Sequence, residues 1–201
     1  NSLEQAASVA KDFKTGVHIH LLEGVHERKM SLDLHGMNPL EACMECGILD
    51  VPVIAAHCVH LDESDMVLIH EKNIIPVHCP SSNLILGSGI SPVPNLIQHD
   101  VVVAIGTDGA ASNNNLNMLE EMHIASLIHK GVNMDPELMK AETVLDMGTA
   151  NGAKALGFEN TGVIEAGKDA DLILIDMDKP HLLPLRNHKA AMIYSVQGSD
   201  V

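Results

Sequence analysis

Four short hydrophobic runs of this chain end in a side chain that can bind a metal or move a proton. The runs are GVHIH ending at His20, VPVIAAH ending at His57, NIIPVH ending at His78 and VVVAIGTD ending at Asp108. Each is β-branched and followed by helix-like sequence, which is typical of parallel βα units. The carboxyl ends of parallel strands lie on one rim, so these side chains are expected to converge there. Three imidazoles and a carboxylate together predict a metal ion, a hydrolytic water and an enzyme.

The elements that position these side chains are predicted from periodicity and from helix-capping signals. Strands are expected over residues 16–22, 51–57, 74–78 and 101–106, with long loops at 79–91 and 107–117. Helical sequence covers 2–14, 23–47 with a second helix starting at Pro39, and the segment opened by the acids at 62–65. Further helices are expected near 94–99, 116–130, 135–147 and 149–156. This alternation predicts an α/β fold.

The pattern changes after Gly157. Residues 161–170 are rich in turn-forming residues, and residues 171–176 (DLILID) form a run that predicts a buried strand. We therefore expect a first domain of βα units over 1–157 and the start of a small β-rich domain over 158–201.

Composition and charge exclude several classes of partner. The chain has 201 residues, a net charge of −15 and 46% hydrophobic residues, but only Phe13, Phe158 and Tyr194 are aromatic. Nucleic acids and anionic membranes attract clustered Lys and Arg, and bases stack on aromatic rings, so neither partner is expected. The longest apolar runs are shorter than the roughly 20 residues of a membrane span, and no signal segment is evident. A cytoplasmic protein is expected.

Four cysteines allow more than one interpretation. Cys43 and Cys46 form one C-x-x-C pair inside a predicted helix, which is a weak zinc signal without a second pair. Cys58 and Cys79 each follow a strand-end histidine. Buried thiols in a reducing compartment are the favoured interpretation. A non-enzymatic zinc module stays the alternative, although it leaves the four strand ends unexplained.

Several segments together resemble the amidohydrolase superfamily, and most closely its deaminases of adenosine thioethers. These segments are HIHLLE at 18–23, AHCVH at 56–60, PSSNL at 80–84, GTDGAASNN at 106–114 and GVIEAGKDADL at 162–172. The resemblance covers essentially the whole chain. It implies a (β/α)8 TIM-type barrel with one divalent metal ion, usually zinc, with iron or another divalent ion as the alternative. It also implies a small-molecule nucleoside substrate, and a homo-oligomer is expected.

The resemblance assigns roles residue by residue. His20 matches the metal ligand of the fifth barrel strand, and Asp108 matches that of the eighth. Glu23 matches the carboxylate that contacts the substrate ring, and His57 matches the histidine beside the hydrolytic water. Glu23, His57 and Asp108 are thus the expected catalytic residues, and the same three with Asn83 are expected to bind substrate. His18 could instead form a first-strand H-x-H with His20, but only 37 residues separate that pair from His57.

Four βα units correspond to the second half of such a barrel, together with part of a small β-sandwich domain. Four strands leave an open edge on each side, and two of the family's four metal ligands have no match here. The chain is therefore expected to be part of a longer protein, and the alternative is an inactive fragment.

The expected reaction is hydrolytic deamination of S-adenosylhomocysteine or 5′-methylthioadenosine. Zinc lowers the pKa of its water to about 7, and Asp108 could accept the proton of that water. Glu23 could then protonate the ring nitrogen while His57 stabilises the attacking oxygen. The structural alternatives are that Asp108 forms a turn, that Glu23 is an acid at a helix N-terminus, and that His60 and His78 are hydrogen-bonded rim residues.

Related amidohydrolases, such as guanine or cytosine deaminases or triazine chlorohydrolases, would share this chemistry. Their functions therefore stay as alternatives. The cytidine-deaminase class is excluded, because no histidine precedes a glutamate by two places and Ala42 stands where that class has a proline. The remaining histidines lie on predicted helices or loops and are expected to face solvent: His26, His35, His70, His99, His123, His129, His181 and His188.

Overall fold

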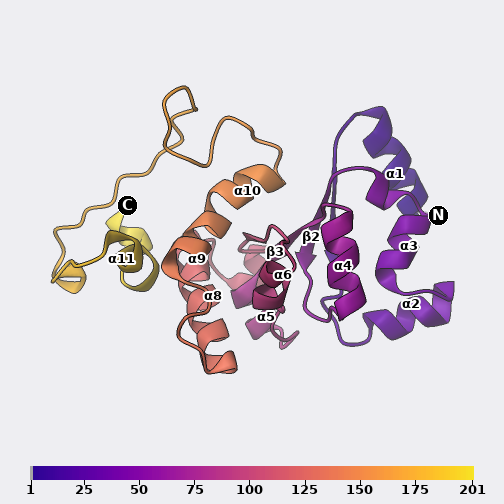
Figure 1. Ribbon diagram of the computed structural model, residues 1–201, viewed down its shortest axis with the longest axis horizontal. Coiled ribbons are helices and arrows are strands. Elements are labelled where there is room, and N and C mark those ends of the chain that lie inside the picture. Colours follow the sequence, from indigo (N-terminus) through magenta and orange to yellow (C-terminus); the bar gives the residue numbers. More distant parts are fainter. Residues whose placement is uncertain (1) are drawn as a thin grey trace. The chain divides into compact units, whose positions relative to one another are not determined.

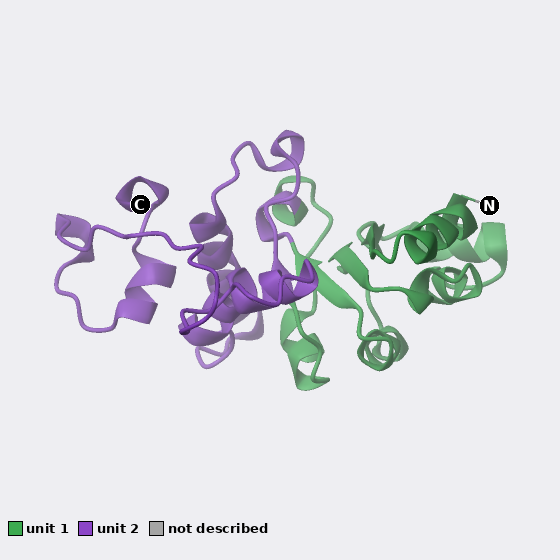
Figure 2. Cartoon of the chain, turned by 90° about the horizontal axis from the view of Figure 1, so that it is seen from above, with its two compact units in different colours: residues 1–78, 83–103 green, residues 79–82, 104–201 purple. Residues whose placement is uncertain are grey.

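The computed structural model describes residues 2–201 and shows alternating strands and helices (Figure 1). The chain forms two compact units (Figure 2). Unit 1 comprises the chain up to His78 together with Asn83–Val103, and unit 2 comprises Cys79–Ser82 and Ala104–Val201. The predicted boundary after residue 157 stays a prediction.

Unit 1 is built on three parallel strands in consecutive order, as the sequence predicts. They are β1 (Val17–Leu21), β2 (Val53–His57) and β3 (Ile75–His78). In the register, His20 lies opposite Ala56 and Leu21 opposite His57, while Ala56 lies opposite Val77. The carboxyl ends of all three strands therefore lie on the same edge of this sheet.

The helices of unit 1 precede, connect or follow these strands. They are α1 (Ser2–Asp12), α2 (Glu27–His35), α3 (Pro39–Glu45), the 3-10 turn η1 (Ile48–Asp50), α4 (Glu63–Glu71) and α6 (Val93–Gln98). Pro39 begins α3, as predicted, and a capping box forms there, with Glu41 N donating to Asn38 Oδ1 and Asn38 N donating to Glu41 Oε2. Helix α4 is capped in the same way by Asp62 and Asp65.

Unit 2 contains the short strand β4 (Ala104–Ile105) and several helices, some of which pack on this strand. They are α7 (Ala110–Asn113), α8 (Met118–Asn133), α9 (Ala141–Gly148), α10 (Ala150–Ala155) and α11 (His188–Tyr194), with 3-10 turns η2 (Pro180–Leu182) and η3 (Gly198–Asp200). Two hydrogen bonds attach α11 to α8: Ser126 Oγ lies 2.8 Å from the Tyr194 hydroxyl, and His123 Nδ1 lies 2.9 Å from the carbonyl of Ile193.

Both predicted long loops contain a helix. The first holds α5 (Pro80–Ile85), and the second holds α7. Strand β4 is shorter than predicted, and α9 begins at Ala141 instead of near residue 135. Local contacts explain why α9 starts later than predicted. Asp135 Oδ1 accepts a hydrogen bond from Glu137 N, and Lys130 Nζ donates to the carbonyl of Pro136. These contacts hold the backbone in a turn.

The prediction of a buried strand over residues 171–176 is wrong. This segment has no regular secondary structure, and Leu172, Ile173 and Leu174 are 57%, 59% and 88% exposed. A strand forms only where a neighbouring strand accepts its backbone hydrogen bonds. Within residues 2–201, no other strand pairs with this segment.

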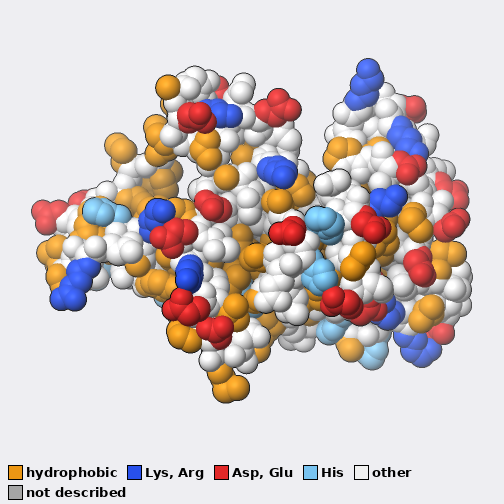
Figure 3. Space-filling view, viewed as in Figure 1, with side chains coloured by type: hydrophobic (Ala, Val, Ile, Leu, Met, Phe, Trp, Pro, Cys, Tyr) orange, Lys and Arg blue, Asp and Glu red, His pale blue; other side chains and the backbone are white. Residues whose placement is uncertain are grey.

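The surface carries charged side chains of both signs. On the face drawn in Figure 3, Lys and Arg side chains are interspersed with Asp and Glu and form no basic stripe. Over residues 2–201, no helix combines the length and apolar character needed to cross a membrane.

Candidate active site

Three histidines lie at the carboxyl edge of the unit 1 sheet. His20 is on β1, and His57 and His78 are the last residues of β2 and β3. The rings of His20 and His57 are stacked, with centroids 5.3 Å apart and planes 14° apart. His57 and His78 are buried, whereas His20 is exposed. The predicted convergence at one rim is therefore present for these three strands.

The turns beyond β1 and β2 carry unusual backbone conformations. Leu22, His57 and Cys58 have φ angles of 50°, 72° and 48°, in the left-handed region that disfavours side chains. Three hydrogen bonds join the turns: Cys58 N donates to Leu21 O at 3.0 Å, and Val59 N and His60 N donate to Leu22 O at 3.0 and 2.9 Å. Backbone strain of this kind costs about 1–3 kcal/mol per residue and is concentrated at functional sites.

The orientation of the His57 ring is fixed by Asn83. Its Nδ1 lies 2.8 Å from Asn83 Oδ1, and both side chains are buried. An amide oxygen only accepts hydrogen bonds, so Nδ1 carries a proton and directs it toward Asn83, while Nε2 points the other way. That nitrogen lies 3.5 Å from Glu23 Oε2. Asn83, predicted to bind substrate, therefore contacts His57, and its substrate contact stays a prediction.

Glu23 lies in the turn between β1 and α2 with its carboxylate partly exposed. Its Oε1 accepts a hydrogen bond of 3.0 Å from the Ser88 hydroxyl, and its Oε2 faces His57. Glu23 therefore does not cap α2; the turn-closing carboxylate is Glu27, which accepts from Gly24 N at 2.7 Å. The geometry leaves Glu23 facing the predicted catalytic histidine.

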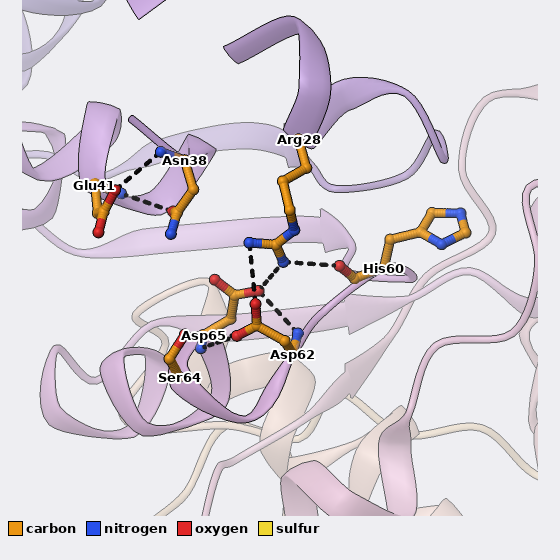
Figure 4. Close-up of polar contacts among 7 residues, drawn as sticks. All are labelled: Arg28, Asn38, Glu41, His60, Asp62, Ser64 and Asp65. Carbon is orange, nitrogen blue, oxygen red and sulfur yellow. Dashed lines mark hydrogen bonds and ion pairs between the residues drawn. The ribbon is translucent and has the colours of Figure 1, made fainter. Parts of the chain in front are cut away.

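His60 is a hydrogen-bonded residue that supports the turn. Its Nε2 lies 2.9 Å from the carbonyl of Ser88, and its own carbonyl accepts from Arg28 Nη2 at 3.2 Å. Figure 4 shows the Arg28 guanidinium between this carbonyl and the two acids at the start of α4. Arg28 Nη1 lies 3.1 Å from Asp62, and Nη2 is paired with the buried Asp65. A hydrogen bond from Ser64 is the largest of several effects that lower the pKa of Asp62.

In unit 2, Asp108 follows β4 and also has a left-handed backbone, with φ of 59°. Its Oδ2 accepts hydrogen bonds from Ser82 at 2.6 Å and from Ser112 at 2.7 Å. Its Oδ1 accepts from Gly109 N at 2.7 Å. Such bonds fix the orientation of a carboxylate and are typical of metal-binding carboxylates.

The loop that carries Asp108 is held by Glu121, which the sequence analysis missed. Glu121 is fully buried on α8, where it accepts hydrogen bonds from Asn113 Nδ2 at 2.7 Å and from Ser81 N at 3.1 Å. Asn113 also binds the carbonyl of Thr107 at 2.6 Å. The burial of Glu121 could have been inferred from its spacing. Glu121, Ala125 and His129 are four residues apart and share the buried face of one helix.

Two further predictions have clear outcomes. His129 is buried and not solvent-facing, and burial lowers its pKa to about 4. All four cysteines are thiols; three are buried as predicted, and Cys46 is partly exposed. Burial raises the pKa of Cys43 to about 11. In the part of the chain that the structure describes, neither Cys43 nor Cys46 belongs to a group of three metal-capable side chains.

Comparisons with known proteins agree with this fold and arrangement. The chain belongs to the amidohydrolase family, whose model matches residues 1–199. It is 56% identical over its whole length to the 5-methylthioadenosine/S-adenosylhomocysteine deaminase of Acetivibrio thermocellus, covering 47% of that protein. It is 45% identical to the 5'-deoxyadenosine deaminase of Methanococcus vannielii over 98% of this chain and 47% of that protein.

A solved structure supports the fold assignment. The zinc-bound adenosine deaminase of Xanthomonas campestris superposes with a TM-score of 0.91 and 37% identity, over 96% of this chain and 44% of that one. The chain thus spans about half the length of the curated relatives it matches. The predicted α/β class and amidohydrolase membership are confirmed.

Proposed function

We propose that the native protein is a metal-dependent hydrolytic deaminase of adenosine thioethers, S-adenosylhomocysteine and 5′-methylthioadenosine. One observation carries this proposal: Glu23 Oε2 lies 3.5 Å from Nε2 of His57, beyond the carboxyl ends of β1 and β2 in a chain of the amidohydrolase family. The names of the two relatives support an adenine nucleoside altered at the 5′ position. 5′-Deoxyadenosine is accordingly the nearest alternative substrate.

The residues fit a divalent metal ion, which we propose is zinc, as in the Xanthomonas campestris structure. His20 offers an exposed imidazole on β1, and Asp108 offers a carboxylate fixed by three hydrogen bonds. Imidazole nitrogens and carboxylate oxygens are standard zinc donors. When bound, such an ion supplies a water acidic enough to react near neutral pH.

The protein's own side chains move the protons. His57 Nε2 holds the attacking water by a hydrogen bond, and Asp108 accepts the proton that this water releases. Glu23 protonates the ring nitrogen next to the amino-bearing carbon as the new carbon–oxygen bond forms. Asp108 then passes its proton to the amino group, the carbon–nitrogen bond breaks and ammonia leaves. The remaining hydroxyl proton returns to Glu23 as the carbonyl product forms. Asn83 keeps His57 in the required tautomer.

Ammonia release by the native full-length protein tests the proposal. We expect S-adenosylhomocysteine or 5′-methylthioadenosine to yield ammonia and the inosine analogue. Glu23→Gln should lower kcat by about 10²–10⁴-fold, because it removes a general acid–base group while leaving the proposed metal ligands in place. Zinc content, measured by elemental analysis, should be unchanged.

Asp108→Asn is expected to be more damaging and to reduce the zinc content as well. If guanine or cytosine releases ammonia and the adenosine thioethers do not, the proposed mechanism still stands but the proposed substrate is wrong. Undiminished turnover by Glu23→Gln would remove the proposed proton path.

A further inference from the structure

We propose that Ser88 is a positioning residue that assigns different tasks to the two carboxylate oxygens of Glu23; this inference rests on the proposed role of Glu23. The Ser88 hydroxyl donates a hydrogen bond of 3.0 Å to Oε1. A hydroxyl that donates to one oxygen of a carboxyl group restricts the orientation of that group. Oε1 is thereby engaged, and Oε2 is left to exchange protons beside His57 Nε2, 3.5 Å away.

The position of Ser88 is itself tightly defined by the turn that carries His57. The Ser88 carbonyl accepts a hydrogen bond from His60 Nε2 at 2.9 Å, and Ser91 Oγ donates to Cys58 O at 2.8 Å. Between them, Gly89 has a φ of 120°, and a Cβ there would lie 2.9 Å from Val59 Cγ1. The segment 88–91 therefore lies directly against residues 58–60, and a glycine is required at the point of contact.

The same turn is anchored from α2. Arg28 Nη2 donates to the carbonyl of His60 while its guanidinium is paired with Asp62 and Asp65 (Figure 4). One connected set of contacts thus runs from Arg28 through His60 to Ser88, and from Ser88 to Glu23. Sixty-five residues separate Ser88 from Glu23 in sequence, so this contact is a product of the fold.

A purely structural role for Ser88 gives a different expectation. If its hydroxyl only completes the packing of segment 88–91, its loss should lower the stability of the protein and leave kcat unchanged. If it orients Glu23, its loss should lower kcat, leave zinc binding unchanged, and matter only while Glu23 carries a carboxyl group.

The experiment compares three variants of the native full-length protein. Ser88→Ala should reduce kcat by about tenfold or more with KM within about threefold, since a misplaced acid–base group slows the chemical step. Ser88→Thr retains a hydroxyl and should restore most of kcat. Thr161→Ala is the matched control, because Thr161 Oγ1 also donates to a carboxylate, that of Asp171 at 3.2 Å, but in an exposed segment of unit 2 that has no part in this network. Its kcat should equal that of the unmodified protein.

A double-mutant cycle and a crystal structure complete the test. In the Glu23→Gln background, adding Ser88→Ala should change kcat by less than about twofold. In crystals of Ser88→Ala, the Glu23 carboxylate should leave its position beside His57. An unchanged kcat together with an unmoved Glu23 would overturn the inference while leaving the deaminase proposal intact. If adenosine thioethers prove not to be substrates, the crystal structure alone decides it.

Discussion

Single side chains at the candidate site are oriented by neighbours distant in sequence. Asn83 sets the tautomer of His57, and Ser82 and Ser112 orient Asp108. In each case a short polar group donates to, or accepts from, a group predicted to take part in catalysis, so orientation and protonation are fixed before substrate arrives.

One buried residue predicts a pH dependence of stability. Burial lowers the pKa of His129 from an ordinary 6.5 to about 4 in the folded protein. Below pH 6.5 the His129 imidazole is therefore protonated in the unfolded chain, whereas in the folded protein it stays unprotonated down to about pH 4. The free energy of unfolding should be at its full value above pH 6.5 and should fall by roughly 3 kcal/mol between these limits.

Urea unfolding of the native protein at pH 7.5, 6 and 5 measures this dependence. The His129→Gln variant provides the comparison, because it lacks the titrating group but keeps the same helix. The difference in unfolding free energy between the two proteins should shrink as the pH falls. Parallel curves for the two proteins would contradict the assignment.

At the scale of elements, the pairing of β1 with β2 depends on a close approach of the two backbones at Gly16. Gly16, just before β1, lies so near β2 that a Cβ would be 2.7 Å from the carbonyl oxygen of Pro52. That carbonyl also accepts a hydrogen bond from Val17 N at 2.8 Å. The first ladder contact of β1 and β2 thus requires a residue without a side chain.

Gly16→Ala should destabilise the protein by about 1–3 kcal/mol, because rigid backbone must move to admit the methyl group. Gly131→Ala is the control: it lies inside α8, and a Cβ there would meet nothing within 4 Å. That change should be neutral or stabilising by about 0.5–1 kcal/mol. Denaturant unfolding of both variants gives the comparison, and equal effects would refute the proposed contact.

For the whole molecule, metal binding should be coupled to folding. A ligand that binds only the folded state stabilises it, by about 2.7 kcal/mol at one hundred times its dissociation constant. Added zinc should therefore raise the thermal midpoint of the chelator-treated native protein. His20→Ala should abolish that shift, because it removes a proposed ligand from an exposed position on β1.

The cysteine pair provides the contrast for this experiment. A double change of Cys43 and Cys46 to serine should leave the zinc-induced shift intact. If the shift instead disappears with these cysteines and persists in His20→Ala, the zinc-module alternative is supported. The raised pKa of Cys43 disfavours that outcome, since the thiolate is the form that binds metal.

The sequence by itself determined the parallel strands, the placement of His20, His57 and His78 at strand ends, and the family. These features follow from local patterns, because hydrophobic periodicity and capping residues act over a few positions. The segment 171–176 shows the limit of such patterns, since it has strand-like composition but no partner strand within residues 2–201.

Only the tertiary structure decided which side chains support the site. The His57–Asn83 and Glu23–Ser88 contacts join residues 26 and 65 positions apart. The burial of Glu121 and His129 likewise depends on what packs over α8, and not on their own residue types. Hydrogen bonds and desolvation act through distance in space, and that distance is set by the path of loops whose conformation no local pattern encodes.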